Sequence, residues 1–352
     1  MYKLMKFDLK IEIILIVLFC STFLLFWEVP QALDLGRYYE RAFKMAVQYP
    51  NALDYLQYDI DLNTDFIYRF ILYAMARFGI NLNIATIFFM SAYFTIALIT
   101  WNCFGGARAG LVNIVSLCSL FSAPIIWSFT ISRTLAAVVF LYAAIFFFFR
   151  QKYSIMLFFA LMSFFTHISM LLFIVLLIFA FVLWKNKFAS DHNIPLFAIM
   201  IFIAVFLSFS MNFFESTLFV FGMEKSRYAV YANTISTNFF ANPYLGLHDK
   251  LPVLFNIILC LFCVIFNKKN DFIYWALFVF TIALVFFVFM DVMMTQRITI
   301  VMPLLIGCNL YGCLGSNKNL SVLNAVNAIC CLSLLISLYN VFGYRSSFHF
   351  FI

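Results

Sequence analysis

The feature that most constrains this chain is a stretch from Tyr153 to Trp184 that contains 32 residues and no Asp, Glu, Lys or Arg. As one helix it would extend about 48 Å, which is too long for a hydrocarbon core of about 30 Å even at a steep tilt. Basic residues flank both ends of the stretch, and short basic loops favour the cytoplasm. The pattern therefore predicts a hairpin of two helices, 153–166 and 168–184, with His167 at its turn on the outer side of a membrane.

Apolar stretches recur along the whole chain. Hydrophobic residues make up 66% of the 352 residues, charged residues make up 11%, and the mean hydropathy is +1.02, which excludes a soluble globular domain. We expect a single all-α, polytopic membrane domain over residues 1–352, with about 11 transmembrane helices. The expected spans are 11–29, 83–103, 109–128, 131–149, 153–166, 168–184, 195–213, 251–267, 271–291, 295–314 and 320–342.

Polar segments define two outer loops in this topology, at residues 30–65 and 213–250. The segment 65–80 is short for a span, and its polar residues recur every four positions along one stripe. These residues are Asp65, Arg69, Tyr73 and Arg77. We expect this segment to form a helix that lies in the outer interface. If it crossed the membrane instead, every later loop would change sides.

The kind of basic residue differs between the two sides of this topology. The inner side carries nine lysines and two arginines, whereas the outer side carries three lysines and eight arginines. A guanidinium is a planar fork that holds phosphate through paired hydrogen bonds, whereas lysine in a cytoplasmic loop mainly sets orientation. The bias predicts a phosphate-binding site that faces outward.

Two of the outer arginines lie at the expected starts of spans. Arg133 follows Ser132, and Arg297 comes two residues after Thr295, so that each has a hydroxyl nearby that can cap a helix. Free N–H groups at a helix start attract anions, so each arginine is a candidate half of a pyrophosphate clamp. The alternative is that each arginine extends to the lipid headgroups.

The outer loops carry candidate residues for binding a sugar. The first loop contains Asp34, Arg37 and Tyr38 just after the first span, and the second loop contains Glu224 and Arg227. Carboxylates and guanidinium groups hydrogen-bond to hydroxyls, and aromatic rings offer flat apolar faces. For both segments the alternative is an ordinary solvated loop.

His167 has two interpretations. Deep in a membrane, a neutral histidine would hydrogen-bond to a neighbouring helix, whereas at an outer turn it can face an aqueous site. Because the ordinary pKa of histidine is about 6.5, it could there act as a base, orient an acceptor or donate to a phosphate. We expect a functional role.

Metal and nucleotide motifs are absent from the sequence. All nine cysteines lie in apolar stretches, and no H-E-x-x-H, Walker-type glycine loop or G-x-S-x-G occurs. We therefore expect no metal, no cofactor and no ATP-driven pump.

Four short motifs together resemble a known family. They are D-x-x-R-Y-Y at 34–39, S-R-T-L-A-A at 132–137, F-F-T-H-I-S at 164–169 and Q-R-I-T-I-V-M-P at 296–303. With the order of the spans, they resemble the EpsG-like branch of the Wzy polysaccharide polymerases. The residues that fall on the motif positions are Asp34, Arg37, Arg133, His167 and Arg297, whereas Glu224 and Arg227 rest on the topology alone.

The resemblance implies a glycosyltransferase with a GT-C-like helical arrangement in the bacterial inner (plasma) membrane. Such enzymes join the repeat units of O-antigen, capsule or exopolysaccharide, carried on undecaprenyl pyrophosphate, at the outer, periplasmic face. The implied partners are the lipid-linked glycan, the bilayer and a chain-length regulator protein, with no nucleic acid and no cofactor. The expected catalytic residues are Arg133, His167 and Asp34, and the expected substrate-binding residues are Arg37, Tyr38, Arg297, Arg227 and Glu224.

Other functions stay open on the sequence. A ligase that transfers finished polymer would use nearly the same residues as a polymerase. A flippase or other transporter would have polar residues at mid-span and related halves, and a membrane acyltransferase would draw its donor from the cytoplasm. The catalytic base is equally open among Asp34, Glu224 and His167.

Overall fold

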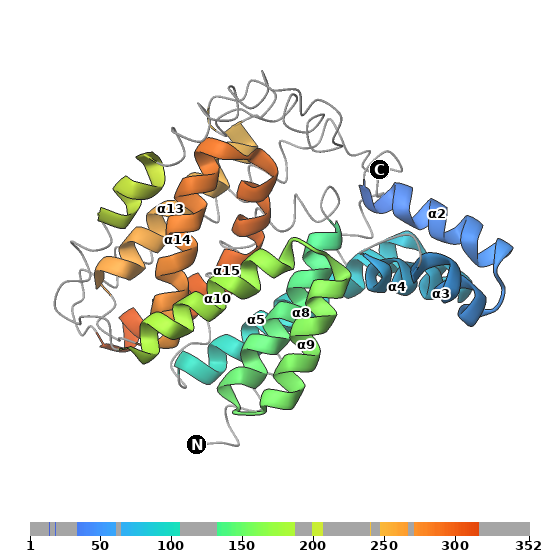
Figure 1. The fold of residues 1–352 in the computed structure, drawn as a ribbon, viewed down its shortest axis with the longest axis horizontal. Helices are drawn as coiled ribbons and strands as arrows, with labels where there is room; N and C mark the ends of the chain where they lie inside the picture. The colour runs from blue at the N-terminus through green and yellow to red at the C-terminus, as the bar shows by residue number, and fades with distance from the viewer. Residues whose placement is uncertain are drawn as a thin grey trace. The chain divides into compact units, whose positions relative to one another are not determined.

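The computed structural model describes residues 14, 18, 34–60, 65–105, 132–186, 199–206, 240, 247–266 and 271–316, and within these ranges every regular element is a helix (Figure 1). They are α2 (Asp34–Gln48), α3 (Ala52–Ile60), α4 (Phe66–Arg77), α5 (Leu82–Gly105), α8 (Ser132–Phe149), α9 (Tyr153–Thr166), α10 (Met170–Lys185), α13 (Leu247–Phe266), α14 (Phe272–Met290) and α15 (Val292–Ser316). The chain divides into two compact units, the first made of Met1–Val175 with Ser337–Ile352 and the second of Leu176–Ile336.

Several of these helices are long and apolar enough to cross a membrane. In the described part of the chain they contain the segments Ile84–Trp101, Ser132–Phe149, Phe272–Met290 and Val292–Asn309. Shorter apolar helices accompany them, including α9 and α10. The helices indicate a multi-pass membrane protein, as the hydropathy predicts. The expected spans 11–29, 109–128 and 320–342 lie outside the residues that can be described, apart from the isolated positions 14 and 18.

The helix break predicted at His167 is present, whereas the packing of its two helices as a hairpin stays a prediction. Helix α9 ends at Thr166, and His167 adopts an extended backbone with φ −159° and ψ 122°. The N–H of His167 still donates to the carbonyl of Ser163 at 3.1 Å, and the N–H of Met170 donates to the carbonyl of His167 at 2.9 Å. The turn therefore keeps these backbone groups hydrogen-bonded while it breaks the helix at the one histidine of the stretch.

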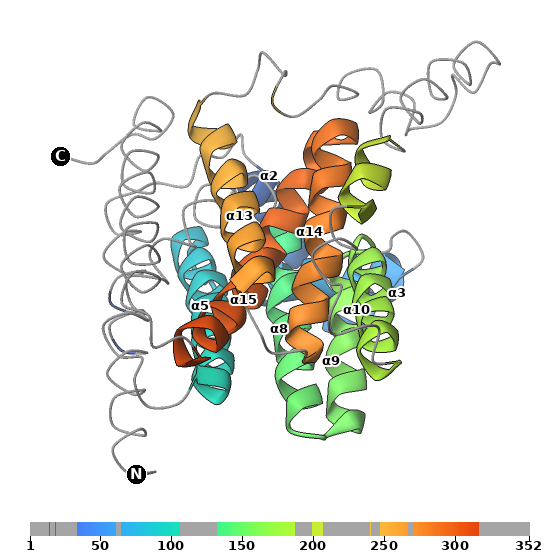
Figure 2. The ribbon, with the colours of Figure 1, turned by 90° about the vertical axis from the view of Figure 1, so that its left-hand side faces the viewer.

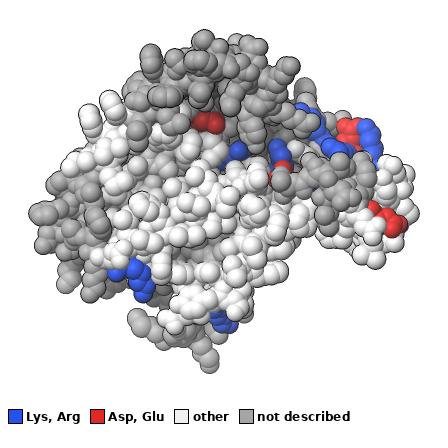
Figure 3. All heavy atoms as spheres, in the orientation of Figure 1, with Lys and Arg blue, Asp and Glu red and all other residues white. Residues whose placement is uncertain are grey.

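Helices α8 and α9 run antiparallel and pack closely in the first unit (Figure 2). The hydroxyl of Ser163 on α9 donates to the carbonyl of Ala137 on α8 at 2.8 Å. Phe147 and Phe159 stack with their ring centroids 5.4 Å apart. In lipid, close packing and interhelical hydrogen bonds hold helices together because the surrounding tails are as apolar as the side chains. Apart from Arg133 near the start of α8, the two helices carry no charged residue along their length, and Arg150 and Lys152 lie at the turn that joins them. Figure 3 shows that much of the described surface of the protein is uncharged.

The expected first outer loop is largely helical, since it forms α2 and α3. Both pack on α4, which has only 12 residues and would span about 18 Å as a helix. Three of the four residues of the polar stripe, Asp65, Arg69 and Tyr73, are buried, and Arg77 is exposed. The position of this helix in the outer interface stays a prediction. The hydroxyl of Tyr73 donates to the carbonyl of Tyr49 at 2.7 Å. The covering helices thus turn this stripe into an interior contact.

In the second unit, α13, α14 and α15 pack against one another (Figure 2). The amide of Asn309 on α15 donates to the carbonyl of Ile273 on α14 at 3.1 Å. Trp275 and Phe278 are fully buried on α14. These contacts join α13, α14 and α15 into the described core of this unit.

Candidate functional site

Three charged or titratable side chains that are far apart in the sequence meet in the first unit. Asp65 directly precedes α4, Arg133 is the second residue of α8, and His167 lies at the turn between α9 and α10. Arg133 Nη1 lies 2.7 Å from Asp65 Oδ2, and His167 Nδ1 lies 3.2 Å from Asp65 Oδ1. Each carboxylate oxygen therefore has its own partner, and we refer to these three residues as the Asp65 cluster.

The Asp65 carboxylate is shielded from solvent, with 13% of its side chain exposed. Burial alone would raise the pKa of Asp65, but the hydrogen bond from His167 and the charges of His167 and Arg133 outweigh it and lower the pKa to about 2. An ionised carboxylate can only accept hydrogen bonds, so Nδ1 of His167 must carry the proton between them. In the neutral imidazole, Nε2 is then the basic nitrogen.

Helix α4 begins at Asp65 without using its side chain as a cap. Although Asp65 occupies the N-cap position, its carboxylate accepts no hydrogen bond from the first turn. Aspartate at this position ordinarily satisfies one of the open N–H groups of the helix. Here the two oxygens contact Arg133 and His167 instead. This indicates that an aspartate is needed at position 65 for the cluster rather than for capping the helix.

An aromatic side chain from α2 lies against the Arg133 guanidinium, and one from α4 supports it. Arg133 Cζ lies 4.7 Å from the ring centroid of Tyr38. The Tyr38 ring meets the ring of Tyr68 edge-on at 5.7 Å, and the Tyr68 hydroxyl lies 2.6 Å from the hydroxyl of Ser132. Two of the motifs noted in the sequence therefore touch each other, because Tyr38 comes from D-x-x-R-Y-Y and Arg133 from S-R-T-L-A-A.

The contact between Tyr38 and Arg133 has a measurable consequence for stability. Replacing Tyr38 with leucine should remove the cation–π contact and cost about 1 kcal/mol, whereas Tyr38→Phe should keep most of it because the ring is retained. A loss of this size lowers an apparent melting midpoint by roughly 2–4 °C in a unit of this size. Thermal unfolding of the purified protein, followed by intrinsic fluorescence, measures both variants, and equal midpoints for the two would contradict the contact.

The other expected site residues of the first outer loop have different positions. Asp34 is the first residue of α2, and its side chain lies outside the described part of the structure. Arg37 lies on the same helix and is exposed. The adjacent Tyr39 donates its hydroxyl to the carbonyl of Ile80, which ties α2 to the residues just before α5. Glu224 and Arg227 fall outside the described residues.

Arg297 lies in the second unit, near the start of α15. The sequence predicts that Thr295 opens this helix, but α15 begins at Val292, and the side chain of Asp291 caps it by accepting from the N–H groups of Met293 and Met294 at 2.7 and 3.1 Å. Thr295 lies inside the helix, and its hydroxyl donates to the carbonyl of Asp291 at 2.8 Å. The expectation of a threonine cap is therefore wrong, because an acid at the break after α14 takes that role.

The Arg297 side chain is half-buried, and its Nη1 donates to the sulfur of Met294 at 3.6 Å. Arg133 and Arg297 belong to different units of the chain. A joint pyrophosphate clamp formed by the two arginines thus stays a prediction.

The sequence interpretation missed the role of Asp65. It placed this residue on an interfacial stripe because an acid four residues before an arginine on a short helix fits that pattern. The sequence did contain a signal for this role. Arg133 and His167 are basic residues expected on the outer side, and a buried basic group needs a counter-charge. Asp65 is an acid that lies between two expected membrane elements. Among the described residues, no group of three or more His, Cys, Asp or Glu is placed to hold a metal ion.

Comparison with known proteins gives one match. No curated protein and no solved structure matches the chain. The model of the EpsG family matches residues 6–351, which is nearly the whole sequence. This coverage includes all four motifs and every residue of the Asp65 cluster, so the chain belongs to the EpsG family.

Proposed function

We propose that this protein is a polysaccharide polymerase that joins repeat units carried on undecaprenyl pyrophosphate, at the outer face of the bacterial inner membrane. Membership in the EpsG family supports a role in exopolysaccharide biosynthesis. The observation that carries the enzymatic part of the proposal is the Asp65 cluster, in which one buried carboxylate orients both a histidine and an arginine.

In the proposed reaction, a hydroxyl of the incoming lipid-linked unit attacks the anomeric carbon of the growing chain. A new glycosidic C–O bond forms, the C–O bond to the carrier breaks, and polyprenyl pyrophosphate leaves with the bonding electron pair. The proton of the hydroxyl passes to Nε2 of His167, since Asp65 holds the proton of the ring on Nδ1. The hydrogen bond between His167 and Asp65 supports His167 as the base among the three candidates.

Arg133 would stabilise the charge that develops on the leaving pyrophosphate. Its ion pair with Asp65 and its contact with the Tyr38 ring hold the guanidinium in one orientation, while 26% of the side chain is exposed. A donor that is already oriented needs no reorganisation as charge develops, which is the main source of electrostatic catalysis. Arg37 and Tyr38, on the exposed helix α2, are proposed to contact the glycan.

The test is the electrophoretic profile of surface and lipid-linked glycan from cells that lack this chain. We expect a single repeat unit in place of a ladder, with the ladder restored by the wild-type chain. A normal ladder that accumulates on its lipid carrier would contradict polymerisation and indicate a ligase. Repeat units trapped on the cytoplasmic side would indicate a flippase.

A further inference from the structure

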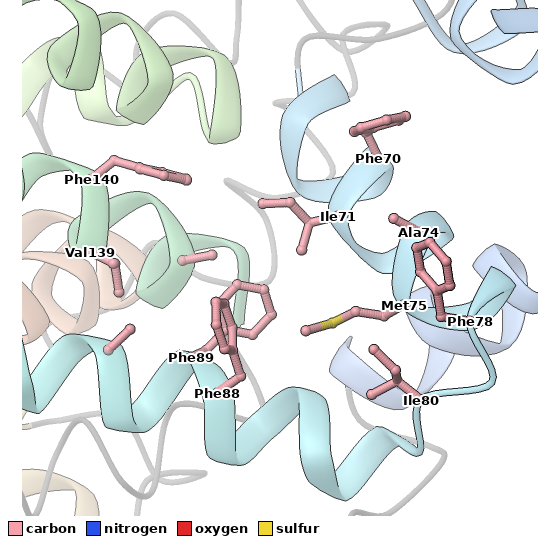
Figure 4. Close-up of a pocket in the computed structure, with 12 residues that line it drawn as sticks. Phe70, Ile71, Ala74, Met75, Phe78, Ile80, Phe88, Phe89, Val139 and Phe140 are labelled. Carbon is pink, nitrogen blue, oxygen red and sulfur yellow. The ribbon is translucent and has the colours of Figure 1, made fainter. Parts of the chain in front are cut away.

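An apolar pocket lies between α4, α5 and α8. It has a volume of about 350 Å³, and every residue that lines it is apolar. Side chains from α4, among them Phe70, Ile71 and Met75, face Phe89 of α5 and Phe140 of α8 across the space (Figure 4). The volume lies at the lower end of the roughly 300–1,000 Å³ that is common for ligand sites, so it suits a segment of a molecule.

Two aromatic residues at the pocket are strongly exposed. Phe78 has 81% and Phe88 has 56% of its surface exposed. Both line the pocket, and Phe88 belongs to the membrane-spanning part of α5. Exposed phenylalanines on such a helix are suited to contact lipid tails rather than water. The pocket therefore opens to the apolar phase, through which an acyl or isoprenoid chain could enter it.

The same helices that line the pocket also carry the Asp65 cluster. On α8, Arg133 precedes the lining residue Ala136 by three positions, which is about 4.5 Å along a helix axis. On the other wall, Asp65 directly precedes α4, and the lining begins one turn later at Phe70. A guanidinium beside a wholly apolar pocket is complementary to an amphiphile with an anionic head and a hydrocarbon tail.

We propose that this pocket binds a segment of the isoprenoid chain of the polyprenyl diphosphate, with the diphosphate directed toward Arg133. The inference rests on the proposed function, which supplies that substrate class. A chain that leaves lipid for this pocket gains no hydrophobic stabilisation, because both surroundings are apolar. Recognition must come from packing, and the aromatic walls would distinguish a methyl-branched isoprenoid from a straight acyl chain by shape.

The experiment uses the full-length protein in lipid nanodiscs of defined phospholipid, with an undecaprenyl diphosphate that carries a photoreactive diazirine in an isoprene unit near the diphosphate. Mass spectrometry of the irradiated protein should find the label on peptides of α4, α5 and α8. A phospholipid with the same diazirine group in its acyl chain is the control probe, because acyl chains of the bilayer are the alternative occupant of the pocket. Equal labelling of the three helices by the phospholipid probe would overturn the inference, since the pocket would then be a general lipid contact.

Variants that fill the pocket sharpen the test. Ala74 and Ala92 line it and are half-buried, so Ala74→Trp and Ala92→Trp add bulk there, whereas Ala160→Trp adds the same bulk to a half-buried position of α9. We expect roughly tenfold less isoprenoid labelling in the first two variants and wild-type labelling in the third. Size-exclusion profiles identify any variant that fails to fold. If a variant does not fold, the labelling pattern of the wild-type protein alone tests whether the pocket binds the isoprenoid chain.

The outcomes also separate this inference from the proposed function. Labelling of α4, α5 and α8 in a protein that makes no polymer would leave the pocket assignment intact and refute polymerisation. Polymer formation with no isoprenoid label on these three helices would refute the pocket and leave the polymerase proposal standing.

Discussion

Replacing Asp65 with asparagine is expected to reduce polymer formation at least about a hundredfold, the range that general acid–base catalysis contributes. The amide keeps the size of the side chain, but it loses the charge that pairs with Arg133 and offers N–H groups to Nδ1 of His167. The imidazole is then free to adopt the other tautomer, in which Nε2 carries the proton and cannot accept one. The measurement is the rate at which purified protein in liposomes extends a lipid-linked repeat unit.

A matched control is available on the neighbouring helix. Asp54 is an exposed acid in the first turn of α3, and Asp54→Asn should leave the rate within about twofold of wild type, as is usual for solvated surface positions. Asp65→Glu keeps the charge and should recover part of the rate. If Asp54→Asn and Asp65→Asn lowered the rate equally, the positioning role of Asp65 would be refuted.

The ionised state of Asp65 determines how its contribution to the fold depends on pH. Because the pKa of Asp65 is about 2, its carboxylate stays ionised at every pH used for an assay. The stabilisation it gives the fold is complete above its ordinary pKa of 3.8 and is lost only as the pH falls through about 2. A change of rate between pH 7 and 5 therefore does not come from protonation of Asp65.

Arg133→Lys is expected to lower polymer formation by at least tenfold, and up to about a thousandfold if the arginine contacts the leaving group directly. The substitution keeps the charge but replaces the planar fork with a single ammonium group. That group cannot contact the Asp65 carboxylate and lie flat on the Tyr38 ring in the way the guanidinium does. The assay is the same liposome extension, with the lipid-linked donor varied to separate binding from turnover.

Arg150 provides the control for this substitution. It follows the last residue of α8, at the opposite end of the helix from Arg133, and its exposed side chain places Cζ 5.4 Å from the ring centroid of Phe146. Arg150→Lys should leave the rate near wild type, because either side chain supplies the positive charge of that turn. Normal polymer yield from Arg133→Lys would refute the proposed role of the guanidinium.

The helix break at His167 and the site differ in how far the sequence could predict them. The break at His167 follows from the length of one uncharged stretch and the charges that flank it, which are local properties. The contact of Asp65 with Arg133 and His167 depends on the packing of three helices, and the side chains are 68 and 102 positions away along the chain. Hydropathy and charge patterns assign a side of the membrane, and they carry no information on which neighbours meet there.

The polar stripe of α4 illustrates the same limit. Residues spaced four apart on a short helix form the same pattern whether they face lipid headgroups or the interior of the protein. Here α2 and α3 cover the stripe, so that Tyr55 stacks on Tyr73 with 4.1 Å between ring centroids. The sequence predicts the wrong start for α15 for a related reason. Both Asp291 and Thr295 are suitable caps, and the choice depends on where α14 ends.

The shortness of α9 and α10 has a consequence for the membrane itself. Helices of 14 and 16 residues would cover only about 21 and 24 Å, against a hydrocarbon core of about 30 Å. If both helices cross the membrane with His167 on the outer side, a local depression of the outer leaflet above His167 would relieve this hydrophobic mismatch, at a cost of fractions of a kcal/mol per ångström. The depression would bring headgroups and water down to the turn, so the thickness of the host bilayer becomes one of the factors that determine how easily a sugar reaches the imidazole.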